Sequence, residues 1–340
     1  MSMLPIRAPD PRDSSLCSDS VPGDDAVRVT GLYIYPVKSC GGVSVPSWTV
    51  TEAGLEYDRQ WMIVRGKTVL TQKREPLLSQ IKARVDLDRR VLVLAFRNFI
   101  ALLWPRVAFL MHRFMADTHL RHNDLHCYDD LRGEEDIEVD LESSGDTIGP
   151  NSLCLGKVCG EEVEGYDCGR EVGAWLDTVL GLTGVKLVRG VRRKSQLLEG
   201  SKSLANDSSC LVLGQASVDL LAQEVNRRCD LQGENEDQFT CLRLTQRFRP
   251  NILLSTRLPF QEEDWAQFEA GGRQFSVSGP CRRCQVIRVE QDTGEVTMEP
   301  LRSLAAMKDR AFNFGVHSRP RTPGTSRLAV GDTVSYVTKL

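Results

Sequence analysis

The amino-acid sequence predicts an α+β protein in which strands predominate. Short apolar runs bounded by turn residues recur along the chain, whereas stretches with a helical repeat of apolar residues are few and amphipathic. The chain has 340 residues, of which 41% are hydrophobic and 26% charged, so it is long enough for two subdomains. Its formal net charge of -3 gives no reason to expect a nucleic-acid or membrane-surface partner.

The start of the chain is predicted to be a disordered leader. Residues 1–26 are rich in Pro, Ser and Asp and lack the apolar run of a secretory signal or membrane anchor. Five acidic residues argue against a transit peptide.

Eleven cysteines, an odd number with no signal peptide before them, indicate free thiols in a reducing compartment, and we expect a cytoplasmic protein. Five are expected to be ordinary core or surface residues: Cys154, Cys159, Cys210, Cys229 and Cys241.

The first predicted strand covers Val27–Tyr35 and ends at Pro36. Lys38 and Ser39 follow at once, at the mouth of the strand. A lysine beside a hydroxyl and free backbone amides is a reasonable contact for an oxyanion or a phosphate. The alternative is a solvated lysine at the end of a strand.

A second strand is predicted within 58–64, where a charged entry precedes a buried run. Gly66 and Lys67 then form a hairpin into residues 68–72. Arg59 either reaches a ligand or pairs with its neighbour Asp58.

Two helices are predicted in the middle of the chain. Apolar residues recur at helical spacing from Val172 to Leu180, and Gly181 ends that helix. A polar loop, 201–209, leads into a strand at 211–213, and Ser217 is expected to be the N-cap of the next helix.

The segment Phe248–Asn251 (FRPN) is predicted to open a strand at 252–254. The planar fork of Arg249 suits a phosphate or a carboxylate, and Asn251 offers both a donor and an acceptor. The alternative is a surface ion pair with a turn-stabilising Asn. We favour a ligand site.

The segment Gly279–Cys284 (GPCRRC) is a basic loop with two thiols, predicted to lie between strands at 273–277 and 285–289. Gly and Pro are expected to break the first strand, and the flanking guanidinium groups favour the thiolate, which binds soft metals or attacks sulfur. Alternatives are half of a zinc site, a redox pair or two ordinary thiols. A zinc site would need a second CxxC or CxxH pair, and the sequence contains none.

Taken together, YPVKSC (35–40), FRPN and CxRC, in that order, resemble the MOSC proteins, which bind the molybdenum cofactor. The resemblance runs from about Val27 to the C-terminus. It implies an N-terminal β-barrel-like subdomain over 27–189 and a C-terminal MOSC β-barrel with peripheral helices over 190–340. Finer matches at GPCRRCQ, QDTG (291–294), NFG (313–315) and TQKREP (71–76) look more like molybdenum cofactor sulfurase than like the mitochondrial amidoxime reducing component.

The resemblance also implies the site. Cys284 would be the metal ligand, and Cys281 a neighbour that relays sulfur or packs; both are our catalytic candidates. Arg283 would help to hold the thiolate and the anionic ligand. Further cofactor contacts implied by the motifs are Lys38, Ser39, Arg59, Ser208, Ser209, Arg249 and Asn251.

In the sulfurase family a separate pyridoxal-phosphate domain draws sulfur from cysteine, and the MOSC domain holds the molybdenum cofactor that receives it. The resemblance therefore implies a sulfurtransferase module that serves acceptor molybdoenzymes such as xanthine dehydrogenase and aldehyde oxidase. We expect the pyridoxal-phosphate domain to be absent from this chain. The alternative function is a molybdenum-dependent reductase of N-hydroxylated substrates, as in the amidoxime reducing component, whose N-terminal anchoring segment we do not expect in residues 1–26.

One segment, about 97–133, has no counterpart in the family and is predicted to be a loosely ordered insertion. His112, His119, His122 and His126 fall there, within about 80 degrees of one helical face, which is metal-ligand spacing. A zinc or scaffold protein that uses these histidines is the third hypothesis. Charged residues and a proline interrupt the apolar part, so no membrane span is expected.

Overall fold

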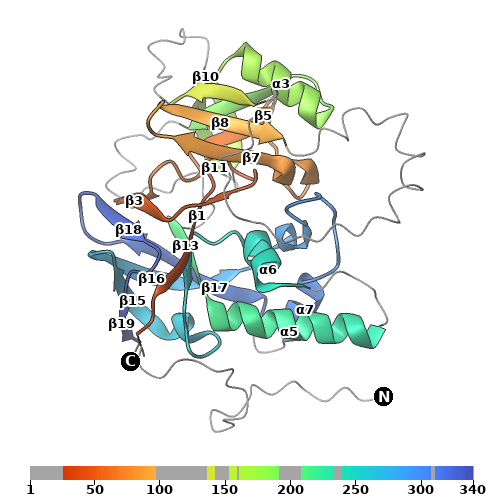
Figure 1. Cartoon of the computed structure of the whole chain (residues 1–340). Coiled ribbons are helices and arrows are strands. Elements are labelled where there is room, and N and C mark those ends of the chain that lie inside the picture. The colour runs from red at the N-terminus through yellow and green to blue at the C-terminus, as the bar shows by residue number, and fades with distance from the viewer. Residues whose placement is uncertain are drawn as a thin grey trace.

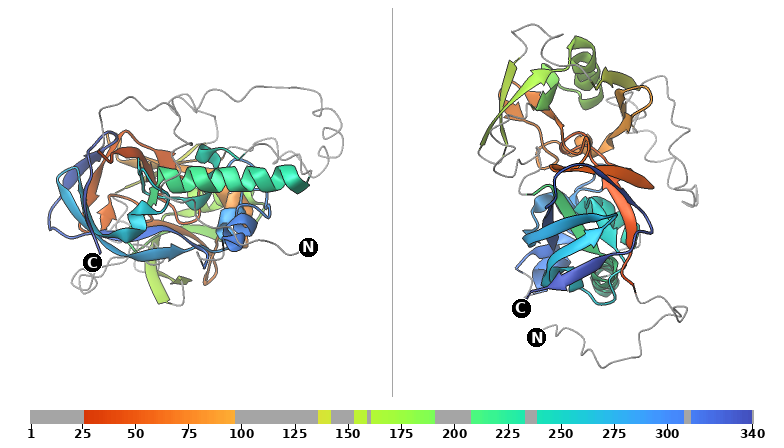
Figure 2. Two further views of the ribbon diagram at one scale, coloured as in Figure 1. Left: turned by 90° about the horizontal axis from the view of Figure 1, so that it is seen from below. Right: turned by 90° about the vertical axis from the view of Figure 1, so that its left-hand side faces the viewer.

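The computed structural model describes residues 26–96, 136–141, 153–158, 161–190, 208–232, 239–307 and 311–339. Nearly all of the predicted leader, the whole predicted insertion and its four histidines lie outside the described residues. Figures 1 and 2 show a β-barrel at one end of the molecule and a large curled sheet at the other, with α-helices packed on both.

The barrel in the N-terminal half of the chain is closed by five strands. They are β10 (Leu153–Val158), β11 (Glu161–Asp167), β12 (Val185–Gly190), β5 (Trp61–Arg65) and β6 (Thr68–Val69). Strand β5 is buried on both faces: Trp61 and Ile63 belong to the main core of this half, and Met62 and Val64 to a separate small cluster. A continuous apolar run is what a strand covered on both sides requires. The Gly66 hairpin between β5 and β6 is confirmed.

Beside the barrel lies a three-stranded antiparallel sheet of β7 (Ile81–Asp86), β8 (Val91–Phe96) and β9 (Ile137–Asp140). Helix α3 (Arg170–Leu180) packs its apolar stripe on this half of the molecule. It ends at Gly181, which has φ 63° and suits the left-handed C-cap. The 3-10 helix η2 (Pro76–Gln80) leads into β7.

The eight-stranded sheet belongs mainly to the C-terminal half, but it also includes strands from the start of the chain. Its order is β19 (Ser335–Thr338), β15 (Trp265–Ala270), β16 (Arg273–Arg282), β17 (Asn313–Pro320), β13 (Cys210–Gly214), β14 (Ile252–Leu254), β1 (Val29–Ile34) and β2 (Val43–Ser44). The first strand of the chain therefore pairs with β14 of the second half. A further small sheet consists of β18 (Ser326–Ala329), β3 (Ser47–Thr51) and β4 (Gly54–Leu55).

Three helices cover this sheet: α5 (Gln215–Gln232), α6 (Cys241–Phe248) and α7 (Leu301–Ala306). They share one apolar core, in which the rings of Phe248 and Phe314 lie 4.4 Å apart between centroids. Strands β13 and β14 run parallel, and α5 and α6 form the crossover that parallel strands need. The mixed β-rich class and the N-terminal barrel are thus confirmed.

Three local predictions are wrong. Ser217 is not an N-cap: α5 begins at Gln215, and the Ser217 hydroxyl binds the buried carboxylate of Glu262. Strand β16 is not broken at Gly279 and Pro280 but continues to Arg282. Its register with β17 shifts on both sides of these two residues, which allows the strand to continue although proline has no N–H to donate. Residues Gln285–Arg288 form the 3-10 helix η7 instead of a strand.

No helix in the described parts of the chain is long and apolar enough to cross a membrane.

Candidate functional site

The site begins where β1 leaves the sheet, at the junction between the two halves. Asp58 is buried, and its Oδ1 accepts a hydrogen bond from the Tyr35 backbone N–H at 2.9 Å. The other oxygen, Oδ2, lies 2.5 Å from Nη1 of Arg59. The Arg59 backbone N–H donates to the carbonyl of Tyr35, with Arg59 itself at φ 49°. Asp58 thus fixes both the end of β1 and the Arg59 side chain, so the pairing that was the alternative to a ligand contact exists, and a cofactor contact of Arg59 stays a prediction.

Arg59 connects this corner to the FRPN segment. Its Nη1 donates to Oδ1 of Asn251 at 3.0 Å, and its Nη2 donates to the carbonyl of Arg249 at 3.1 Å. Asn251 is buried, and its side chain also accepts from the Leu211 N–H and donates to the Tyr33 carbonyl. Asn251 therefore ties β1, β13 and β14 together. A direct contact between Asn251 and a cofactor stays a prediction.

Arg249 is a buried guanidinium at the end of α6, with its backbone at φ 57°. It lies over the Tyr35 ring, 4.4 Å from the centroid, and Arg59 lies over the same ring at 4.5 Å. Burial lowers the pKa of Arg249 to about 10, and the nearby charge of Arg59 acts in the same direction. Among the described residues, its polar side-chain partner is the neutral amide of Gln291, at 3.3 Å, and no carboxylate pairs with it.

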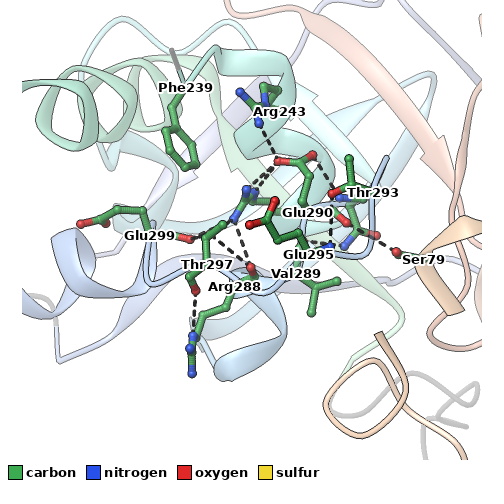
Figure 3. Close-up of polar contacts among 12 residues, drawn as sticks. Ser79, Phe239, Arg243, Arg288, Val289, Glu290, Thr293, Glu295, Thr297 and Glu299 are labelled. Carbon is green, nitrogen blue, oxygen red and sulfur yellow. Dashed lines mark hydrogen bonds and ion pairs between the residues drawn. The ribbon is translucent and has the colours of Figure 1, made fainter. Parts of the chain in front are cut away.

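The loop that carries Gln291 is anchored by a buried ion pair (Figure 3). Glu290 lies 2.5 Å from Nη2 of Arg247 and 3.1 Å from Nη2 of Arg243. Although burial of Glu290 opposes ionisation, these two guanidinium groups lower the pKa of its carboxyl. The amides of Gln291 and Gln72 exchange two hydrogen bonds, of 3.1 and 3.2 Å. Arg249 is thus held by a loop that also reaches the N-terminal half.

The two-thiol segment is bonded to Phe248, the residue before Arg249. Arg283 donates from Nη2 to the carbonyl of Phe248 at 2.6 Å and from Nη1 to Sγ of Cys281 at 3.1 Å. Cys281 is buried at the end of β16, where His317 of β17 also hydrogen-bonds to it. Cys284, by contrast, is exposed and lies at the N-cap of η7. The two thiols therefore occupy different environments.

The remaining predicted contacts have the following neighbours. Lys38 donates its backbone N–H to the carbonyl of Trp61 at 2.7 Å, and Ser39 has φ 67°. Ser208 donates its hydroxyl to the carbonyl of Ser318, next to His317. Ser209 lies against Gly54. For these four predicted residues, Lys38, Ser39, Ser208 and Ser209, a cofactor contact stays a prediction.

Three predicted site residues, Ser39, Arg59 and Arg249, have positive φ. Non-glycine residues in this region are strained, and such strain is concentrated at functional sites. Sequence reasoning missed Tyr35, Gln291 and His317 as participants. Tyr35 and Gln291 stand inside the quoted motifs YPVKSC and QDTG, and His317 follows NFG by two residues, which was the available signal.

A cluster of three or more His, Cys, Asp or Glu side chains suited to a metal does not occur among the described residues. The four histidines of the zinc hypothesis lie outside them.

Two family models match: the MOSC N-terminal beta barrel domain over residues 26–102 and the MOSC domain over residues 199–335. The molybdenum cofactor sulfurase of Danio rerio is 32% identical over 335 residues, which cover 94% of this chain and 35% of the relative. That of Homo sapiens is 30% identical over 328 residues, 92% of this chain and 32% of the relative.

The chain thus spans about a third of the length of the curated relatives it matches. A solved structure of a Bordetella bronchiseptica protein aligns with a TM-score of 0.25 and 13% identity, over 42% of this chain and 85% of that chain. That likeness is too low to carry an argument.

Proposed function

This chain belongs to the MOSC-domain proteins, and from that premise we propose that it binds the molybdenum cofactor and holds it for sulfuration of the metal. The observation that carries the proposal is the buried Arg249. Among the described residues no carboxylate pairs with this guanidinium, whose removal from water is costly, and an anionic ligand would offset that cost. The pterin phosphate of the cofactor is such an anion.

The donor set fits the cofactor in two respects. Arg59 and Arg249 supply fixed, oriented guanidinium groups beside Tyr35, and such groups suit phosphate. Cys284 supplies an exposed sulfur ligand on a loop whose base is held by Arg283. When bound, the cofactor would supply a molybdenum centre soft enough to take a thiolate.

Within this proposal each residue has a distinct task. Arg249 neutralises the anionic part of the cofactor, and Gln291 keeps its guanidinium in place. Arg59 is held by Asp58 and in turn holds Asn251 and the carbonyl of Arg249, so these groups are fixed before a ligand binds. Cys284 would be the protein ligand of the metal.

We further propose that the chain acts with a cysteine desulfurase domain or chain and with acceptor molybdoenzymes, in the cytoplasm. The similarity to molybdenum cofactor sulfurases over most of this chain supports that assignment. The boundary near residue 189, between the subdomains 27–189 and 190–340, is part of the same proposal.

The test is the molybdenum, zinc and pterin content of the protein purified from a cofactor-producing host, compared with Cys284→Ala. We expect stoichiometric molybdenum and pterin in the original protein and lost or labile metal in the variant. Cys168→Ala, which changes a free thiol in the N-terminal half, is the matched control and should retain the metal. Zinc without pterin, unaffected by Cys284→Ala, would refute the proposal. Adding N-hydroxylated substrates with a reductant then tests for reductase activity.

A further inference from the structure

Arg273 is a second buried guanidinium, at the opposite end of β16 from the two-thiol segment. It is the first residue of β16, directly after the Gly271–Gly272 turn that joins β15 to β16. Cys281 lies eight residues further on, which is about 25 Å along an extended strand. The Arg273 residue is only 2% exposed. A ligand of this guanidinium would therefore lie apart from the cofactor proposed above.

Only part of the Arg273 guanidinium is used by the fold. Its Nη1 donates to the carbonyls of Pro323 and Gly324, at 3.2 and 2.9 Å. Its Nε and Nη2, which share one edge of the planar group, are buried and have no hydrogen-bond partner among the described residues. Burying such donors without an acceptor costs free energy, and each case in a folded protein requires an explanation. The unused edge of Arg273 is therefore a candidate binding site.

The two unused donors have the geometry of a bidentate site. The Nε–H and Nη2–H bonds of an arginine are parallel, and this fork matches the two oxygens of a carboxylate or a phosphate. Nearby in the chain, the hydroxyl of Ser326, two residues after Gly324, is also buried and has no partner in the described part of the chain. Unused donors at this end of the sheet indicate an anion as the ligand.

The carboxylates near this end of the sheet are already occupied by the backbone. Glu52 accepts from the Gly324 N–H at 3.1 Å, and Asp332 accepts from the Ala329 N–H at 2.8 Å. Neither accepts a hydrogen bond from Arg273. Within the described ranges, the negative charge that would match Arg273 is therefore not supplied by these two neighbours.

The loop 321–325 sets the size and the charge of the ligand. Its carbonyls hold Arg273, and all five of its residues are exposed, so the loop lies between the guanidinium and solvent. Because Nε and Nη2 are shielded, an anion bound to them must be small enough to be enclosed. A carboxylate carries one negative charge and balances one guanidinium, whereas a phosphate of nearly two charges would leave buried charge in excess.

We propose that Arg273 and the loop 321–325 form a binding site for a small carboxylate anion, held by the fork of Nε and Nη2. The bound anion would satisfy both buried donors and tie the β15–β16 turn to the loop between β17 and β18. The site goes beyond the proposed function and does not depend on it, since the cofactor contacts lie at the other end of β16.

The experiment measures the binding of acetate to the full chain. Equilibrium dialysis with labelled acetate, at an ionic strength kept constant with chloride, gives the stoichiometry and the Kd. We expect one acetate per chain and weaker binding of inorganic phosphate. The unfolding temperature should rise by about 2–4 °C when acetate is well above its Kd, because a ligand that binds the folded state stabilises it.

Two variants locate the bound acetate. Arg273→Lys keeps the positive charge but loses the fork, so the affinity for acetate should fall at least about tenfold. Arg249→Gln, which changes the other buried guanidinium, should bind acetate as the original protein does. A crystal structure of the original protein with acetate tests the site without any substitution, and we expect both carboxylate oxygens on Nε and Nη2 of Arg273.

Equal acetate affinity in Arg273→Lys and the original protein would overturn the inference, as would loss of acetate binding in Arg249→Gln. Tighter binding of phosphate than of acetate would refute the carboxylate as the ligand. Water alone on Nε and Nη2, with no saturable acetate binding, would show that the unused edge of Arg273 is only hydrated.

Discussion

At the scale of the residue, the most informative feature is a buried positive charge that pairs with no carboxylate among the residues the structure describes. Arg59 and Arg249 lie over the same tyrosine ring, yet Asp58 pairs with Arg59 and leaves Arg249 with an amide. Two guanidinium groups over one ring repel each other, and burial disfavours the charged form of Arg249, so this arrangement indicates a functional requirement rather than a packing solution. The same reasoning identifies Cys281, the buried thiol whose surroundings favour the charged form.

We predict that Arg249→Gln lowers cofactor binding without lowering the stability of the protein. The apo variant should unfold at the same or a higher temperature, because the buried charge is gone and a glutamine amide can still bond to Gln291. Its molybdenum and pterin content should fall at least about tenfold, since a charge-assisted contact is lost. Thermal unfolding and metal analysis of the purified protein check both parts.

The matched control is Arg273→Gln, another buried arginine with neutral partners, the carbonyls of Pro323 and Gly324. That variant should lose stability and keep its cofactor content. Equal cofactor content in Arg249→Gln and the original protein would contradict the assignment of Arg249.

At the scale of the element, the connection from β13 into α5 depends on a buried carboxylate. Glu262, in the 3-10 helix η6 (Gln261–Asp264), accepts from the Gly214 N–H at 3.0 Å and from the Ser217 hydroxyl at 3.2 Å. Ser217 Oγ in turn accepts from the Phe260 N–H at 2.7 Å. Burial raises the pKa of Glu262 in spite of these hydrogen bonds. These hydrogen bonds hold the residues around the start of α5, and the raised pKa of Glu262 makes this arrangement sensitive to pH.

We predict that Glu262→Gln changes the pH dependence of stability. A carboxyl whose pKa is higher in the folded state holds its proton more tightly there than in the unfolded state. Its contribution to the free energy of unfolding is therefore greatest at low pH and is lost as pH rises from the ordinary value of 4.5 through the raised folded pKa. Urea unfolding over this pH range should show that component in the original protein and not in the variant.

Glu295→Gln, at an exposed loop position, is the control and should leave the profile within about 0.5 kcal/mol of the original. If Glu262→Gln and the original protein keep parallel profiles, Glu262 does not titrate as we expect.

At the scale of the whole molecule, two long-range connections join the halves. Strand β1, near the start of the chain, completes the C-terminal sheet before the chain enters the N-terminal barrel. In the opposite direction, the loop at Gln291 reaches from the C-terminal half to Gln72 and to Lys82 of β7, whose Nζ donates to the Gln291 carbonyl at 3.1 Å. The candidate site lies at this crossing, so its geometry depends on both halves.

We predict that Gln291→Leu weakens the contact between the halves. It would leave the buried amide of Gln72 and the guanidinium of Arg249 without their partner, which should cost about 2–4 kcal/mol of unfolding free energy. Urea unfolding provides the measurement. Thr293→Ala, at an exposed position of the same loop, should cost less than about 1 kcal/mol. Similar losses in the two variants would show that the Gln291 contact does not couple the halves.

The sequence predicted much of the local structure. The period of two in β1, the apolar run of β5, the Gly66 hairpin and the repeat of α3 up to Gly181 were all readable, because each depends on neighbours close in the chain. The path of β16 through Pro280 was not readable. Bulges set by pairing with β17 decide it, and that partner lies about thirty residues further along the chain.

By itself the sequence determined the β-rich class and identified motifs that hold Arg59, Arg249, Cys281 and Cys284, because residue type and spacing fix what each group can do chemically. Tertiary structure alone decided which guanidinium is buried against an amide and beside a second guanidinium, and which thiol has a lowered pKa. Charge balance and pKa depend on burial and on contacts between distant segments. Those contacts, such as Arg59 with Asn251 and Cys281 with His317, exist only after the chain has folded.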